Sequence, residues 1–149
     1  MKNETLFTEK QRFMQWWLWL IMILVVASAF YYEESTLEMV VALLIPLFLF
    51  VLNLETEISQ EGISVRFFPF HLKKNFFSWE EIEKISVREY SPLLEYGGWG
   101  IRRGKSGGAY NVKGNIGLQL VLKNGKKILI GTQKAEELKQ ILAERENKK

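Results

Sequence analysis

Two apolar runs near the N-terminus constrain this chain more than any other feature. Phe13–Tyr32 holds 20 residues without a charge, and Leu37–Leu54 holds 18 residues with Glu38 as its one charged side chain. A helix rises about 1.5 Å per residue, so 20 helical residues span about 30 Å, the thickness of a bilayer's hydrocarbon core. The runs therefore predict two membrane-spanning helices joined by the short segment 33–36.

Aromatic side chains at the ends of the first run favour the same interpretation. Tyr31 and Tyr32 mark one end, and three tryptophans lie near the other, where amphipathic rings settle at the headgroup level. The alternative is a pair of helices buried in a protein core. It is disfavoured because the remaining polar chain is too short to cover both runs.

Basic residues predict the orientation of this hairpin. Segment 33–36 has no Lys or Arg, whereas Arg12 precedes the first run and Arg66 follows the second. Loops rich in Lys and Arg stay in the cytoplasm. We therefore expect a two-pass protein of the cell membrane, with the lipid bilayer as a partner and with both the N-terminus and the C-terminal domain in the cytoplasm.

A second interpretation of the first run stays open. Lys2, Lys10 and Arg12 precede it, and it contains Ala27-Ser28-Ala29, the small-residue pattern that signal peptidases cut. The run is long, rich in aromatics and continues to Tyr32, which favours an uncleaved helix. If cleavage did occur after Ala29, the second run would still be an anchor.

The hydrophobic period changes after the second run and divides the chain into three parts. These are a cytoplasmic N-terminal segment 1–12, a transmembrane helical hairpin 13–54 and a cytoplasmic domain 55–149. In the last part apolar residues alternate with polar ones on either side of Glu61-Gly62, and again before Asn124-Gly125. Alternation predicts strands, and both dipeptides predict hairpin turns.

The end of the chain predicts a helix. Ala135, Leu138 and Leu142 share one helical face, and Thr132 stands where a capping residue is expected. Ser78–Glu81 has the pattern of a capping box, followed by a strand near residues 84–90. The predicted fold class is thus an α+β membrane protein, in which the transmembrane hairpin precedes an antiparallel β-barrel or sandwich closed by a C-terminal amphipathic helix.

Several short motifs resemble a known family. They are Gly62-Ile63 with Val65, Trp79-x-x-Ile82, the stretch 95–102 (EYGGWGIR), and Gly131-Thr132 before the helix. Together they resemble bacterial pleckstrin-homology-like (PH-like) domains, in a branch of membrane proteins with two transmembrane helices. The resemblance implies a PH-like fold over about residues 55–145, and it is the basis for expecting self-assembly.

The chain departs from the resemblance at the first hairpin. PH domains that bind phosphoinositides carry a basic cluster there. This chain has Glu55, Glu57 and Glu61, with Arg66 as the nearby base. We therefore do not expect a phosphoinositide pocket of that kind.

The segment 97–110 contains six glycines and is the candidate binding region. Nucleotide motifs fail there, because Trp99 stands where a P-loop needs its first glycine and Arg103 where a dinucleotide loop needs its third. The glycines predict a bulged strand and a loop. The candidate residues for binding a partner or a lipid surface are cationic or aromatic: Trp99, Arg102, Arg103, Lys105 and Tyr110.

The composition offers little for catalysis. The chain has no Cys and no Asp, and His71 is its one histidine, so we expect no metal, no cofactor and no catalytic residue. Residues 55–149 hold 17 basic and 12 acidic side chains, too mild an excess to favour nucleic acid. We expect a non-enzymatic interaction module that binds a protein, its own copies or a lipid surface. The alternative is an accessory subunit of a membrane transport or envelope-assembly complex, bound through its transmembrane helices.

Overall fold

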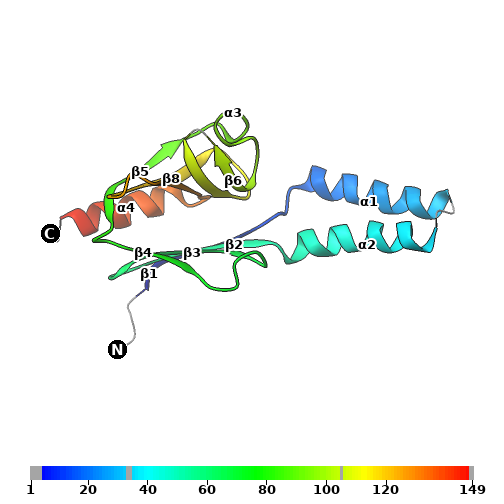
Figure 1. The fold of residues 1–149 in the computed structure, drawn as a ribbon, viewed down its shortest axis with the longest axis horizontal. Helices are drawn as coiled ribbons and strands as arrows, with labels where there is room; N and C mark the ends of the chain where they lie inside the picture. The colour runs from blue at the N-terminus through cyan, green and yellow to red at the C-terminus, as the bar shows by residue number, and fades with distance from the viewer. Residues whose placement is uncertain (1–4, 33–34, 105, 148–149) are drawn as a thin grey trace. The chain divides into compact units, whose positions relative to one another are not determined.

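A computed structural model describes residues 5–32, 35–104 and 106–147 (Figure 1). Its contacts divide the chain into two units. One unit is the helical segment Arg12–Leu52, and the other combines the chain before that segment with the chain after it. In sequence, the helical unit is therefore an insertion within the second unit.

The helical unit is an antiparallel pair. It consists of α1 (Trp16–Tyr31) and α2 (Thr36–Val51), which pack through the buried residues Ala29 and Ala42. Small side chains at this contact let the two backbones approach closely. The rings of Trp19 and Phe50 meet edge to face, with their centroids 6.3 Å apart. Ser35 and Glu38 form a capping box that begins α2.

The predicted transmembrane hairpin is wrong. Within residues 5–32, 35–104 and 106–147, no helix combines the length and the apolar character needed to cross a membrane. Each helix has 16 residues, or about 24 Å at the helical rise. The apolar runs are longer than the helices, because Phe13–Gln15 precede α1 and because Asn53 and Leu54 belong to strand β2. The predicted two-pass localisation in the cell membrane is therefore wrong as well. The alternative of an accessory subunit bound through transmembrane helices is wrong for the same reason.

The second unit contains a four-stranded sheet in the order β1-β2-β3-β4. Ile58 pairs with Ile63 across the turn at Gln60-Glu61, so the predicted hairpin at Glu61-Gly62 is confirmed. The first strand of this sheet comes from the N-terminal segment 1–12, for which the sequence predicted no strand. The strands are β1 (Thr5–Arg12), β2 (Asn53–Ser59), β3 (Gly62–Phe68) and β4 (Asn75–Ser78).

A five-stranded sheet in the order β5-β8-β9-β7-β6 completes this unit. The predicted turn at Asn124-Gly125 is confirmed, with Gly125 at φ +81° and its N–H donating to the Leu122 carbonyl at 2.8 Å. The pair β7–β9 is parallel, which the sequence did not predict. The strands are β5 (Ile82–Glu89), β6 (Gly100–Gly104), β7 (Gly107–Asn111), β8 (Ile116–Leu122) and β9 (Lys127–Gly131).

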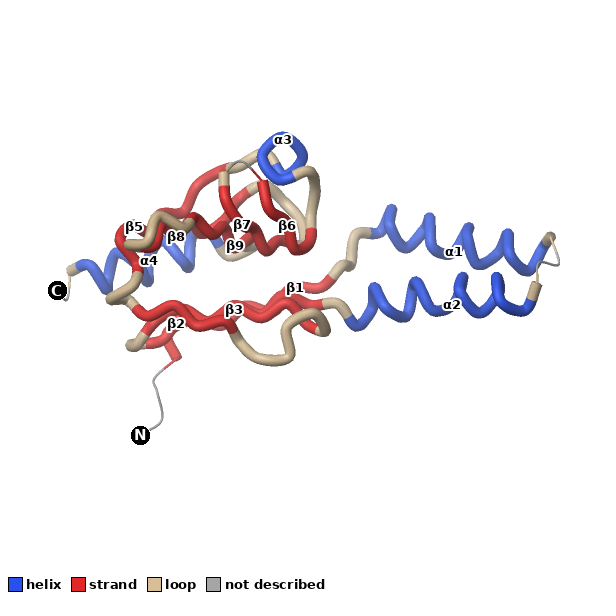
Figure 2. The backbone as a smooth tube through the Cα atoms, in the orientation of Figure 1, coloured by secondary structure: helices blue, strands red, loops and turns tan. Residues whose placement is uncertain are grey.

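Alternation along the strands builds the core between the sheets. Helix α4 (Ala135–Glu146) lies beside β5 (Figure 2) and contributes the buried Leu138. The fold of this unit is therefore a β-sandwich with a C-terminal helix, as the sequence predicted. The predicted cap is displaced: Lys134 is the N-cap, and the Thr132 hydroxyl accepts from its N–H at 3.0 Å. The inner-face residues include Leu54, Ile58, Ile63, Val65, Phe67, Leu118, Leu120 and Ile130.

Polar side chains of β1 tie the start of the sandwich to its end. The Glu9 carboxylate accepts from the Thr132 hydroxyl at 2.7 Å and from the Gln133 N–H at 2.8 Å. The Gln11 amide donates to the Gly131 carbonyl at 2.7 Å. Both β1 side chains are 5% exposed. We call these five residues the β1 lock; cleavage after Ala29 would remove its β1 half.

Candidate functional site

Hairpin β6–β7 carries the binding residues predicted from the sequence. The Trp99 indole N–H donates to the Gly114 carbonyl at 3.1 Å. The Arg102 Nε donates to the Trp99 carbonyl at 2.9 Å. These two side chains therefore hold the start of the hairpin in place.

The other candidates do not join them in one cluster. Arg102 lies opposite the buried Ala109, whereas the neighbouring Arg103 points to the other face of the strand. The Tyr110 ring meets the His71 ring edge to face, with centroids 5.6 Å apart. Lys105 lies outside the described residues. The structure brings Trp99 and Arg102 together but not the whole set, and their role in binding stays a prediction.

Close packing explains two of the glycines without a ligand. A Cβ at Gly104 would lie 2.1 Å from the Glu95 carbonyl oxygen. A Cβ at Gly107, whose φ is +106°, would lie 2.3 Å from the Lys127 carbonyl oxygen. Any side chain at either position would collide with backbone, so glycine is required for the hairpin to pack where it does.

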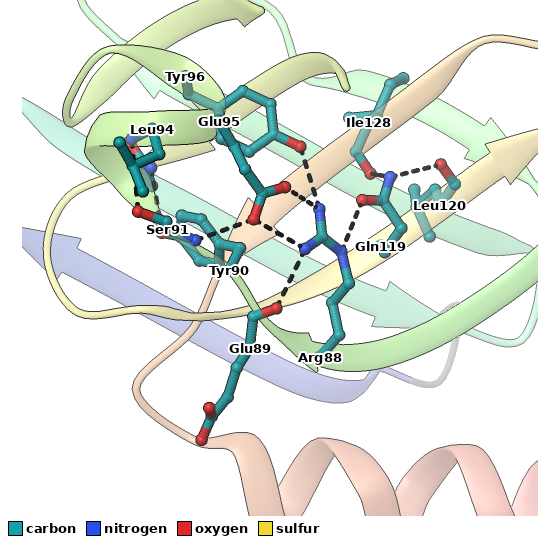
Figure 3. Close-up of polar contacts among 11 residues, drawn as sticks. Arg88, Glu89, Tyr90, Ser91, Leu94, Glu95, Tyr96, Gln119, Leu120 and Ile128 are labelled. Carbon is teal, nitrogen blue, oxygen red and sulfur yellow. Dashed lines mark hydrogen bonds and ion pairs between the residues drawn. The ribbon is translucent and has the colours of Figure 1, made fainter. Parts of the chain in front are cut away.

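An arginine network fixes the short helix α3 (Pro92–Tyr96) before this hairpin (Figure 3). Arg88 reaches Glu95 through both terminal nitrogens, at 3.2 and 2.8 Å. Its Nε donates to the Gln119 side chain at 3.1 Å. The Ser91 N–H also donates to Glu95, at 2.9 Å. Hydrogen bonds from Arg88 hold the pKa of Glu95 below its usual value.

Two tyrosines complete this side of the five-stranded sheet. Tyr90 and Tyr96 meet edge to face at 5.9 Å and form a buried cluster with Ala109 and Leu129. Burial raises the pKa of both hydroxyls. The network and the cluster join these side chains to one another and so stabilise the fold of this region.

Charged side chains on the outer face of the four-stranded sheet also form ion pairs with one another. Glu55 pairs with Lys10 at 2.8 Å and with Arg66 on its other side. Glu57 pairs with Lys74, whose hydrogen bond lowers the pKa of the Glu57 carboxyl. Two of the three acids that depart from a phosphoinositide-binding pattern, Glu55 and Glu57, are thus partners of the nearby bases.

A groove between β5 and α4 is the best remaining candidate, with a volume of about 410 Å³. Ile85 and Val87 form the strand side, and Leu142 and Ala143 form the helix side. All four are half-buried or exposed rather than buried. The lining is Trp79, Ile85, Val87, Lys139, Leu142, Ala143, Arg145 and Glu146.

Trp79 and Arg145 define one end of this groove. The Trp79 indole N–H donates to the Ser59 carbonyl at 3.1 Å, which fixes the ring. The Arg145 guanidinium lies 3.6 Å from the ring centroid. Partial burial lowers the pKa of Arg145. The sequence does not predict this site, because the three segments that form it meet only in the fold.

The family match follows from comparison of the whole chain. A family model described as the bacterial PH domain matches residues 2–149. The chain belongs to this bacterial PH domain family. No curated protein and no solved structure matches the chain. The family predicted from the motifs is therefore confirmed, although the two-transmembrane-helix branch is not.

The match places the helical insertion inside the family's own boundaries. Strand β1, α1 and α2 all fall within residues 2–149. This bacterial PH domain therefore includes the segment before the insertion as well as the strands after it. Within the residues that the structure describes, no group of three or more His, Asp or Glu side chains is arranged to hold a metal ion.

Proposed function

We propose that this bacterial PH domain is a non-enzymatic interaction module that binds a protein partner through the groove between β5 and α4. Membership of the family supports an interaction role in general. The observation that carries the proposal is the groove itself, about 410 Å³ of space between a sheet edge and a helix. That volume lies in the range of ordinary binding pockets.

The groove is favoured over the other surfaces because its walls are incompletely packed. Leu142 on α4 is half-buried, whereas Leu138, one turn earlier, is 1% exposed. Elsewhere, charged side chains pair with one another: Arg88 with Glu95 before hairpin β6–β7, and Glu55 with Lys10 on the four-stranded sheet. An apolar wall that the chain leaves partly open is the feature that a partner can cover.

The proposal includes no turnover. The lining supplies three charged side chains, Lys139, Arg145 and Glu146, and no hydroxyl or imidazole group. Lys139 is paired with Glu136 at 2.8 Å. Such a lining suits contact with apolar and charged side chains rather than a reaction that needs a nucleophile beside a base.

A substitution that fills the groove tests this function. Ala143→Trp places a large ring between α4 and β5, and Gln140→Trp places the same ring at an exposed position of α4 outside the groove. The full chain and both variants are compared by cross-linking in native extracts, followed by mass spectrometry. We expect Ala143→Trp to lose partners that the wild type and Gln140→Trp retain. Identical partner sets for all three proteins would overturn the proposal.

A further inference from the structure

The strand that borders the groove lies at the edge of its sheet. β5 is the first strand in the order β5-β8-β9-β7-β6, so β8 is its one neighbour in that sheet. Alternate residues of such a strand turn their N–H and C=O groups away from the neighbour. The pairing with β8 is irregular between Ile82 and Lys84 and regular from there to Glu89. Of the four edge strands, β1, β4, β5 and β6, β5 is the one that borders this groove.

Side chains beside this edge form an apolar wall with the period of a strand. Ile85 and Val87 are two residues apart, so both point to the same face, where they line the groove. Leu142 and Ala143 lie across from them on α4. An extended segment placed along β5 would direct every second side chain into this space.

The charge of Arg145, at one end of the groove, sets a second requirement for the partner. Among the residues that the structure describes, no carboxylate lies within ion-pair distance of Arg145, whereas the neighbouring Lys139 is paired with Glu136. The Arg145 guanidinium is half-buried against the Trp79 ring and so has lost part of its hydration. A guanidinium held in this way favours a carboxylate brought by a partner.

We infer that the partner adds an extended segment to β5 as an extra strand, with apolar side chains in the groove and a Glu or Asp paired with Arg145. This inference rests on the proposed function, because it uses the same groove. Main-chain hydrogen bonds to β5 would provide affinity, and the pocket and Arg145 would provide sequence preference. A proline in the middle of the segment would remove a donor and weaken binding.

Synthetic peptides test the inference on the full chain. The probe is a fluorescent seven-residue peptide with Val at alternate positions and Glu scanned through the polar ones, beside matched peptides with Gln or Lys in place of Glu. We expect the best Glu peptide to bind about tenfold more tightly than its Gln counterpart. Arg145→Gln should abolish this preference, whereas Lys139→Gln should keep it. A central Pro should reduce binding of the Glu peptide.

Hydrogen exchange supplies the readout for strand addition. Binding of the Glu peptide should slow exchange of β5 amides, and Ala143→Trp should prevent both binding and protection. Equal affinity for Glu, Gln and Lys peptides, or binding without protection of β5, would overturn the inference. So would self-association of the full chain that Ala143→Trp abolishes, because the occupant would then be a second copy.

The two proposals fail in different ways. If Ala143→Trp loses native partners but the peptides show no preference for Glu, binding through the groove is supported. The addition of an acidic segment to β5 is then ruled out. If Ala143→Trp retains every native partner, both fall. Circular dichroism of each variant confirms that loss of binding does not reflect loss of the fold.

Discussion

The sandwich and the helical insertion use apolar residues in different ways. In the sandwich, residues such as Leu54, Ile58 and Leu118 are completely buried. In helices α1 and α2 of the insertion, the buried residues are Ala29 and Ala42, and the large apolar side chains are mostly exposed; Leu44, for example, is 54% exposed. Apolar composition is high in both regions, yet only one of them covers its own apolar surface.

The difference shows what an apolar pattern does and does not predict. Alternation with a period of two specifies which face of a strand points inward, so the pattern itself identifies the side chains that are buried. A run that is apolar on all sides specifies no inward face. The inward-facing residues of β2, β3 and β8 could therefore be predicted, whereas the packing of the insertion could not.

Alanine substitutions of one leucine in the sandwich and one in the insertion should show the largest difference between the two regions. Leu120 is 0% exposed in the sandwich, and Leu44 lies exposed on α2. Leu120→Ala should lower the free energy of unfolding of the sandwich by about 2–5 kcal/mol, because it leaves a cavity. Leu44→Ala should change it by no more than about 0.5 kcal/mol. Urea denaturation followed by fluorescence measures both, and equal losses would contradict the comparison.

The β1 lock tests whether the segment before the insertion belongs to the sandwich. The two Glu9 oxygens accept from Thr132 and Gln133, so Glu9→Gln points an amide N–H toward a donor. We expect a loss of about 1–3 kcal/mol in the free energy of unfolding. Thr8→Ala, at the exposed neighbouring position, is the control and should change stability little. No difference between the two variants would mean that β1 does not stabilise the sandwich.

The ion pair Arg88–Glu95 predicts a smaller, pH-dependent effect. The pKa of Glu95 is lowered from 4.5 in the folded chain, so its stabilising contribution is present above about pH 4.5. That contribution is lost as the pH falls through the lower, folded-state pKa. Glu95→Gln should cost about 1 kcal/mol at neutral pH and less toward pH 3. Thermal unfolding across this range measures it, and a pH-independent difference would exclude the ion pair as the cause.

Removing the insertion should have the smallest effect on the sandwich. β1 and β2 are neighbours in the sheet, and Lys10 Nζ lies 2.8 Å from Glu55 Oε1, so a linker of about five residues can replace 13–52. We expect the sandwich to keep its unfolding midpoint within a few degrees. A large fall would show that the two units do not fold separately; calorimetry distinguishes these results.

Local signals account for what the sequence predicted correctly. The hairpins predicted at Glu61-Gly62 and Asn124-Gly125 depend on a few adjacent residues, and α4 depends on a periodic face. β1 was missed because its inward-facing Glu9 and Gln11 are polar and are buried by partners more than 100 residues away. The transmembrane prediction failed because the length of an apolar run was taken as the length of a helix.

The candidate site was harder to predict for the same reason. Trp99 and Arg102 were two of the five residues predicted to bind, and the structure places the Arg102 side chain against the Trp99 carbonyl at the start of hairpin β6–β7. The groove, in contrast, combines Trp79, Val87 and Arg145, three residues that share no motif. A sequence shows that β5 is a strand, but its position at the edge of the sheet depends on how all the other strands are ordered.

The β1 lock also fixes the order in which the protein can be completed during synthesis. Glu9 and Thr132 are 123 residues apart, so the first strand leaves the ribosome long before the residues that hold its inner face. Closing a loop of that length carries an entropic cost that the last contacts must repay. We therefore expect β1 to dock late, after β9 and the start of α4 have emerged. Until then, a nascent chain would display the unfinished edge of β2 to its surroundings.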